Sequence, residues 1–254
     1  HHIGGKAFRL ENEARATAVL EDIDGVPFVV SAVRRRERAK NPPPPFTTST
    51  LQQEAAKRLG FSAKKTMRVA QQLYEGVELG TEGAVGLITY MRTDSTRIAP
   101  SAAAAARDWI ASSFGERYLP ASPRLWAGKQ QKGAQDAHEA IRPTDAARHP
   151  GRVRRHLDRD QFRLYELIWL RFVAGQMTPA LYDTTTVDFD LAGRSARRYL
   201  FRANGSVLRF DGFTRLYQEA REEGDHRTLD ELAPLPALEP GLACRLLRLV
   251  PAQH

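Results

Sequence analysis

The stretch NPPPPFTTSTLQQEAAKRLGFSAKKTMRVAQQLYEG, residues 41–76, marks a change of pattern in this sequence of 254 residues. Before the four prolines, apolar and polar residues alternate as they do in β-strands, and proline cannot continue a strand ladder or a helix. After them, apolar residues recur at helical spacing. A capping box that begins at Ser49 predicts a helix that Gly60 ends, and Ser62 predicts the cap of a second helix. We therefore expect a domain boundary near residue 45.

β-like patterns stand on both sides of this helical part. Asp24-Gly25 between two β-rich runs predicts a hairpin, and Asn204-Gly205 predicts another tight turn. The predicted strands cover residues 16–23, 26–33, 85–93, 184–190, 197–203, 206–210 and 242–250, and further helices cover about 101–114 and 161–177. The economical fold is α+β: a discontinuous antiparallel β-rich domain, residues 1–45 and 178–254, with a mainly α-helical domain, residues 46–177, inserted into it.

The composition excludes several classes of protein. A chain this long with 42% hydrophobic residues can bury a core without disulfides, and its single cysteine, Cys244, permits no intramolecular bridge. No apolar run reaches the roughly 18 residues of a membrane-spanning helix, so we expect a cytoplasmic protein without membrane partners. The 38 Lys and Arg residues exceed the 30 Asp and Glu residues, and the net charge of +8 makes nucleic acid the expected partner.

The two helices joined at Gly60 resemble a helix-turn-helix unit. Lys64, Lys65 and Arg68 point away from the apolar face of the second helix, as in a helix that faces phosphates. A non-covalent DNA-binding module is therefore one functional hypothesis, and a solvated basic face is the structural alternative.

The decapeptide GLITYMRTDS, residues 86–95, carries a second hypothesis. On a strand, Ile88, Tyr90 and Arg92 share one face, so that a phenol and a guanidinium project side by side. A tyrosine oxygen can attack a phosphodiester and keep the phosphate as an ester, while a planar guanidinium grips the charged oxygens. On spacing alone, an ordinary packing pair is the alternative.

The motif QDAHEAIRPTD, residues 135–145, holds His138 and Arg142 four residues apart. If this segment is helical, both side chains face one way and offer two donors to a phosphate. A zinc site of the HExxH type fails, because Arg142 stands where the second histidine is required. A satisfied structural histidine is the alternative for His138.

Three Asp-x-Asp pairs have the spacing of candidate Mg²⁺ ligands, namely Asp22 with Asp24, Asp158 with Asp160, and Asp188 with Asp190. The first falls in the predicted hairpin turn, the second at a predicted helix start, and the third at a predicted strand end. Each pair thus has a structural explanation. We expect no metal site in this sequence.

Four motifs together resemble the bacterial type IA DNA topoisomerases: residues 45–76, GLITYMRTDS, QDAHEAIRPTD, and ELIWLRFVAGQMTPA at residues 166–180. The resemblance implies that Tyr90 is the nucleophile that forms a 5′-phosphotyrosine link and leaves a free 3′-hydroxyl. It implies that Arg92 positions the scissile phosphate and that His138 contacts the same phosphate. Lys64, Lys65, Arg68 and Arg142 are then candidate DNA contacts.

The resemblance also implies what surrounds these residues. In that family, negative supercoils are relaxed without ATP, on a single-stranded segment of DNA. Mg²⁺ is held by a Toprim domain, which together with a gate domain we expect outside these 254 residues. The β-rich domain then corresponds to the hinged arch and the helical domain to the moving part with the nucleophile. On this reading the chain is a fragment that is inactive alone, from an enzyme associated with the nucleoid.

Overall fold

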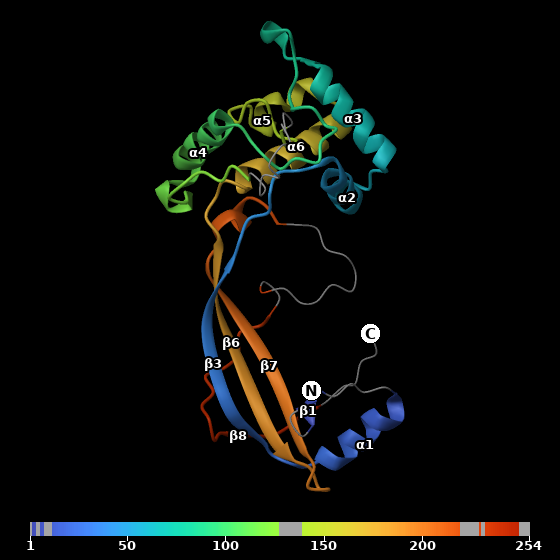
Figure 1. Ribbon diagram of the computed structural model, residues 1–254, viewed down its shortest axis with the longest axis vertical. Coiled ribbons are helices and arrows are strands. Elements are labelled where there is room, and N and C mark those ends of the chain that lie inside the picture. Colours follow the sequence, from blue (N-terminus) through green and yellow to red (C-terminus); the bar gives the residue numbers. More distant parts are fainter. Residues whose placement is uncertain are drawn as a thin grey trace, which may run out of the picture. The chain divides into compact units, whose positions relative to one another are not determined.

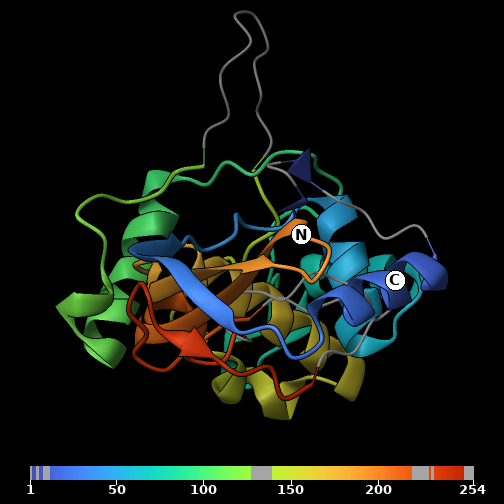
Figure 2. The same ribbon diagram turned by 90° about the horizontal axis from the view of Figure 1, so that it is seen from below.

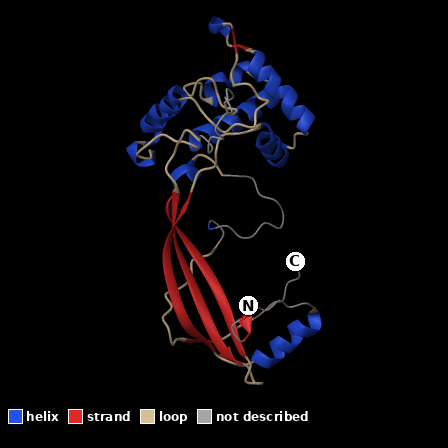
Figure 3. Cartoon of the chain, viewed as in Figure 1, coloured by secondary structure: helices blue, strands red, loops and turns tan. Residues whose placement is uncertain are grey.

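The computed structural model of the chain forms two compact units (Figure 1). It describes residues 2, 3, 6, 7, 12–126, 139–218, 229 and 232–248. The β unit comprises residues 1–39, 181–210 and 224–254, and the helical unit comprises residues 40–180 and 211–223. Helices and an antiparallel sheet occur together, so the predicted α+β class is confirmed (Figure 3).

The unit boundaries differ in detail from the predicted ones at 45/46 and 177/178. The prediction that everything after residue 178 joins the β-rich domain is wrong for the segment that follows residue 210. Phe213 and Tyr217 in this segment are each 2% exposed and pack in the helical unit. Burial of two large aromatic side chains outweighs the position of the segment in the sequence.

The β unit is built on a sheet of strand order β2-β1-β7-β6-β3-β8. Strands β6 and β7 pair antiparallel, from Leu181 opposite Phe210 to Ala192 opposite Arg198, with an irregularity between Leu181 and Tyr182. The long strands β3, β6 and β7 lie side by side (Figure 2). The strands are β1 His2–Ile3, β2 Lys6–Ala7, β3 Phe28–Lys40, β6 Ala180–Ala192, β7 Arg198–Phe210 and β8 Ala243–Cys244. The predicted strand at 242–250 is thus only two residues long within the described part.

The predicted hairpin around Asp24-Gly25 is wrong, because its first arm is a helix, α1, Glu13–Ile23. Asn12 caps this helix by accepting a hydrogen bond from the Arg15 amide at 2.9 Å. The Ala, Glu and Leu residues of α1 have high helix propensity. Gly25 does adopt the predicted positive φ, at 71°. The turn therefore joins a helix to β3 rather than two strands.

The core of the β unit lies where α1 meets the sheet. Ile23, Phe28, Leu191 and Tyr199 are buried together, and Cys244 packs against them. The single cysteine thus serves in ordinary packing.

The turn predicted at Asn204-Gly205 is also wrong, because both residues lie inside β7, opposite Thr186 and Thr185. The turn between β6 and β7 falls at residues 193–197, where the Gly193 amide bonds the Arg197 carbonyl at 2.8 Å. A Cβ atom at position 205 would come within 2.7 Å of the Leu235 side chain. Gly205 therefore allows the segment around Leu235 to pass close to β7, and such a close approach is a known reason for glycine inside a strand.

Asp188 of β6 joins the three long strands. Its carboxylate accepts hydrogen bonds from Arg202 of β7 at 2.6 Å and from Arg34 of β3 at 2.5 Å, and its side chain is 8% exposed. The hydrogen bond from Arg202, assisted by that from Arg34, lowers the pKa of Asp188 even though burial acts in the opposite direction. This carboxylate is thus held charged by both neighbouring strands.

The helical unit surrounds α6, whose apolar residues are almost all buried. Trp169 donates its indole N–H to the Ala146 carbonyl at 3.0 Å, and the Tyr165 hydroxyl donates to the Arg148 carbonyl at 2.6 Å. The helices are α2 Thr48–Leu59, α3 Ala63–Glu75, α4 Pro100–Phe114, α5 Pro150–Val153 and α6 Arg159–Ala174; 3₁₀ turns lie at Gly80–Glu82, Glu116–Tyr118, Arg154–His156 and Gly212–Arg215.

Local capping signals explain the helix ends. Ser62 caps α3 as predicted, and Gly60 ends α2 with a φ of 68°. The cap of α2 is Thr47, which forms a capping box with Thr50, so the predicted box at Ser49 is displaced by two residues. Asp158 forms the capping box of α6 with Gln161, as its structural explanation requires.

Four side chains of the helical unit form an anchoring cluster: Glu54, Arg58, Arg171 and Tyr217. The Tyr217 hydroxyl donates to Glu54 at 2.9 Å, and Arg58 donates to the same carboxylate oxygen at 2.6 Å. Arg171 donates to the Tyr217 hydroxyl at 3.2 Å and to the Pro44 carbonyl at 2.7 Å. The cluster thus fixes both the chain that follows β3 and the chain that follows β7.

Candidate active site

The segment 86–95 is not the strand that its alternation predicts. The strand β5, Ala84–Val85, pairs with β4, Val77–Glu78, and ends before Gly86. Beyond it, a single bridge joins Ile88 to Pro143, which has no N–H to extend a ladder. The residues around Tyr90 are therefore held by individual hydrogen bonds instead of a sheet.

Thr48, the first residue of α2, holds the end of this segment. Its amide donates to the Thr93 carbonyl at 2.8 Å, and its hydroxyl accepts from the Thr93 amide at 2.9 Å. The same hydroxyl lies 2.8 Å from the Met91 carbonyl, to which it donates. One threonine thus satisfies backbone groups on both sides of Arg92.

Thr89 holds the segment from the other side. Its amide donates to the Arg142 carbonyl at 2.9 Å, and its hydroxyl donates to the Ala140 carbonyl at 2.7 Å. The Arg142 amide donates back to the Thr89 hydroxyl at 3.0 Å. Tyr90 therefore lies between two fixed backbone anchors.

Burial separates the side chains of this segment into two sets. Leu87, Ile88 and Met91 are each at most 1% exposed, whereas Tyr90 is 43% exposed and Arg92 is exposed as well. Tyr90 and Arg92 are both exposed and flank the buried Met91, which is the burial pattern that a shared face requires. The predicted shared face is wrong for Ile88, because the extended segment does not keep strict strand alternation.

The second motif is not helical where the structure describes it. Residues 139–142 are extended, with Ile141 bridged to Phe46, so the helix predicted for HEAIR is wrong for this part. Arg142 pairs with Glu139 at 2.6 Å, and its side chain is 11% exposed. This guanidinium is thus engaged by a protein carboxylate. His138 lies outside the described residues.

The basic residues of α3 differ in their surroundings. Lys64 and Arg68 are exposed, as predicted for a face that meets phosphates. Lys65 instead forms an ion pair with Asp160 at 2.6 Å and lies over the Phe61 ring at 4.1 Å. Of the three, Lys64 and Arg68 present their charge to solvent.

The described residues contain no group of three or more His, Cys, Asp or Glu side chains that could hold a metal ion. Asp22, considered above as a ligand, accepts hydrogen bonds from the Ser195 hydroxyl and the Tyr199 hydroxyl, each at 2.7 Å. The Ser195 bond, followed by that from Tyr199, lowers the pKa of Asp22. The donor set that this part of the chain offers does not fit Mg²⁺.

A sequence model of the DNA topoisomerase family matches residues 3–247, which is nearly the whole chain. The chain belongs to the DNA topoisomerase family. The resemblance read from its motifs is confirmed.

The topoisomerase chain is also similar to a solved structure, full-length topoisomerase I from Thermotoga maritima. The two are 37% identical and align with a TM-score of 0.71. The match covers 95% of this chain but 36% of the Thermotoga chain. This topoisomerase chain thus spans about a third of the length of that relative.

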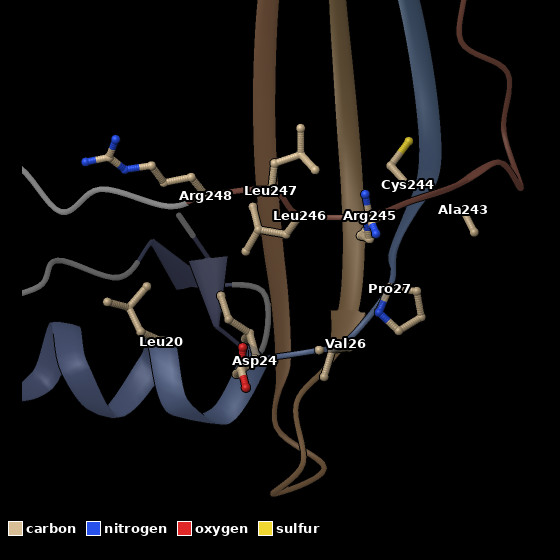
Figure 4. A pocket seen from close by; sticks show the side chains of 12 residues that line it. Leu20, Asp24, Val26, Pro27, Ala243, Cys244, Arg245, Leu246, Leu247 and Arg248 are labelled. Atoms are coloured by element: carbon tan, nitrogen blue, oxygen red, sulfur yellow. The ribbon is translucent and has the colours of Figure 1, made fainter.

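Among its described residues, the topoisomerase chain has no helix that is long and apolar enough to cross a membrane. A pocket lies in its β unit, where its lining includes Leu20, Val26, Cys244, Leu246, Arg245 and Arg248 (Figure 4). Asp24, weighed above as a Mg²⁺ ligand, also lines the pocket, but Tyr90, Arg92 and Arg142 do not.

Three residues that fix the site were not foreseen from the sequence: Thr48, Thr89 and Tyr74. Thr48 contacts a carbonyl 43 residues away, and Thr89 contacts one 51 residues away. The Tyr74 ring packs edge-to-face on Tyr90, with their centroids 5.4 Å apart. No local pattern signals such distant contacts, although the threonine-rich start of α2 is visible in the sequence.

Proposed function

We propose that this chain is the nucleophile-bearing part of a type IA topoisomerase. The Tyr90 hydroxyl gives up its proton as its oxygen attacks a phosphodiester of one DNA strand, a Tyr90–phosphorus bond forms, and the bond from phosphorus to the 3′-oxygen breaks. The 3′-oxygen takes up a proton and leaves as a hydroxyl. Attack by this hydroxyl on the 5′-phosphotyrosine reverses the step, so no ATP is consumed.

The observation that carries the proposal is the exposed Tyr90 on a firmly anchored backbone. A nucleophile must be held in a narrow range of positions, and here Thr48 and Thr89 fix the chain on both sides of Tyr90. Buried Met91 prevents the segment from turning over. The phenol is thus presented to solvent by a backbone that is itself tied to α2 and to residues 140–142.

Arg92 is proposed to bind the nonbridging oxygens of the attacked phosphate. Its guanidinium is exposed next to Tyr90, and within residues 12–126 and 139–218 it forms no ion pair. Arg142 and Lys65, by contrast, are paired with Glu139 and Asp160. Arg92 is therefore the cation of this site best suited to a phosphate ligand.

Other parts of the proposal rest on the family resemblance. His138 is proposed as a further contact of the same phosphate. Mg²⁺ is proposed to be held in the full-length enzyme by a Toprim domain, since the described residues do not fit it. We accordingly expect the 254 residues alone to be inactive. The substrate is proposed to be a single-stranded segment of negatively supercoiled DNA, within the cytoplasm and nucleoid. Lys64 and Arg68 are proposed to contact this DNA as well, and Lys65 and Arg142 to lie in supporting positions.

The test is a chimera in which this chain replaces the matched part of Thermotoga maritima topoisomerase I. Incubated with Mg²⁺ and labelled single-stranded DNA, the chimera is expected to form a covalent adduct that survives denaturation. Tyr90→Phe is expected to abolish the adduct, and Arg92→Ala to reduce its rate of formation by about 10²- to 10³-fold. Tyr118→Phe serves as the control, because Tyr118 is a partly buried tyrosine bonded to Asp211.

An adduct that persists in Tyr90→Phe contradicts the assignment of the nucleophile. A folded chimera that binds DNA without forming an adduct favours the alternative, a non-covalent DNA-binding module built on α2 and α3.

A further inference from the structure

Two exposed tyrosines meet at the candidate active site. Tyr74, in the last turn of α3, is 40% exposed, and Tyr90 is 43% exposed. Their ring planes are inclined at 65° with centroids 5.4 Å apart, which is an edge-to-face pair. An aromatic pair of this geometry is stabilising beyond the burial of its surface.

The backbone enforces this pairing. The Leu87 amide donates to the Leu73 carbonyl at 2.7 Å, so the start of the segment is hydrogen-bonded to the end of α3. At the neighbouring position, a Cβ atom on Gly86 would lie 2.7 Å from the Tyr74 carbonyl oxygen. This close approach places the Tyr74 side chain within reach of Tyr90.

The anchors of the segment leave one degree of freedom open. Thr48 and Thr89 fix the backbone, but the half-exposed Tyr90 ring can still occupy more than one rotamer. Among the described residues, Tyr74 is the aromatic ring that contacts it. A contact that favours one rotamer raises the fraction of molecules whose phenol is correctly aimed.

We propose that Tyr74 is a positioning residue that holds the Tyr90 ring in its reactive orientation. The proposal rests on the proposed role of Tyr90 as nucleophile. It assigns the effect to the ring of Tyr74 and not to its hydroxyl. Tyr74→Phe should therefore behave like the unaltered protein, whereas Tyr74→Ala should lower the single-turnover cleavage rate about 3- to 10-fold, the factor that corresponds to one edge-to-face pair. DNA affinity should remain unchanged.

The first measurement needs no activity. In the 254-residue chain with ring-labelled tyrosines, seven in all, the Tyr90 resonances are assigned by their loss in Tyr90→Phe. Tyr74→Ala is expected to shift them toward the values of a free tyrosine, and Tyr74→Phe to leave them in place. Gln72→Ala is the control, because Gln72 is an exposed residue of α3 with a long 3.5 Å hydrogen bond to Gln161.

The second measurement is the single-turnover rate of adduct formation in the chimera, with the dissociation constant for the same oligonucleotide. A rate loss in Tyr74→Ala at constant affinity, with recovery in Tyr74→Phe, supports the proposal. Loss of affinity at constant rate overturns it and indicates that Tyr74 stacks on a DNA base. Unchanged rate and affinity also overturn it. An adduct in Tyr90→Phe refutes the proposed function instead, and the resonance shifts still show whether the Tyr74 ring contacts Tyr90 in solution.

Discussion

Gly86 lies so close to the end of α3 that a Cβ atom at this position would be 2.7 Å from the Tyr74 carbonyl oxygen. Its amide plane passes beside the end of α3, and the Leu87–Leu73 hydrogen bond of 2.7 Å follows directly. Any other side chain at position 86 would have to displace the Tyr74 carbonyl, which is part of a helix and cannot move alone. The absence of a side chain at Gly86 thus allows the segment to lie this close to α3.

We expect Gly86→Ala to lower adduct formation by the chimera about 10-fold and to destabilise the chain by about 1–3 kcal/mol, because the added methyl group meets backbone at 2.7 Å. Adduct yield and urea denaturation measure the two effects. Gly60→Ala is the matched control: its Cβ would have open space, but its φ of 68° is strained for alanine. It should lose stability yet keep activity, and equal losses of activity in both variants would contradict a local role for Gly86.

At the scale of elements, capping signals predicted the helices α2 and α3, whereas α1 and the segment around Tyr90 were both mistaken for strands. α3 was predicted because Ser62 and Gly76 act within the helix itself. The segment around Tyr90 was mistaken for a strand because its extended backbone is fixed by Thr48 and residues 140–142, which a sequence pattern does not reveal. The exposure of both Tyr90 and Arg92 was predictable, since it depends only on alternation across buried Met91.

The wrong predictions in the β unit have the same origin. Asp24-Gly25 does form a turn, but a turn dipeptide does not specify whether a helix or a strand precedes it. Gly205 has a different function from the one expected, because it makes room for Leu235. Both cases depend on which distant segment packs nearby.

Asp188 gives a prediction for the sheet. Its pKa is lowered in the folded protein, so its stabilising effect is present above the unfolded pKa of about 3.9 and is lost as the pH falls through the lower, folded value. At pH 7 we expect Asp188→Asn to destabilise the β unit by about 1–3 kcal/mol. Below about pH 3.9 the difference between the two proteins should shrink toward zero.

Urea denaturation across this pH range measures that difference. Asp183→Asn is the control on the same strand, since its carboxylate is 58% exposed and lies 3.7 Å from Arg209. It should cost about 0–1 kcal/mol at most. A destabilisation by Asp188→Asn that stays constant down to pH 2.5 would show that shape, not charge, is what matters at this position.

For the whole molecule, the net charge of +8 is a surplus of basic over acidic residues, and the basic residues differ in whether a carboxylate pairs with them. Several cations are already paired with carboxylates, among them Lys65, Arg142, Arg34 and Arg202. Exposed residues such as Lys64, Arg68 and Arg92 remain for a polyanion. The net charge already subtracts the carboxylates of such pairs, so it does not itself tell which cations near the site are available to phosphates.

We expect the isolated chain to bind single-stranded DNA weakly and with strong salt dependence. With two or three phosphates neutralised, the dissociation constant should rise about 7- to 20-fold between 50 and 200 mM salt. Fluorescence anisotropy with a labelled oligonucleotide measures this slope, and Lys64→Ala with Arg68→Ala should flatten it. Arg194→Ala, in the β unit and paired with Asp24, should not. Equal affinity at both salt concentrations would refute an electrostatic origin of binding.

The anchoring cluster has a mechanical consequence. Tension on the chain between β3 and Pro44 reaches Arg171 of α6, and tension on the chain between β7 and Tyr217 reaches both Arg171 and Glu54 of α2. Neither segment can separate from the helical unit on its own while these hydrogen bonds persist. A pull on β7 would therefore be shared by two helices, and Thr48 at the start of α2 would carry the Tyr90 segment along with them.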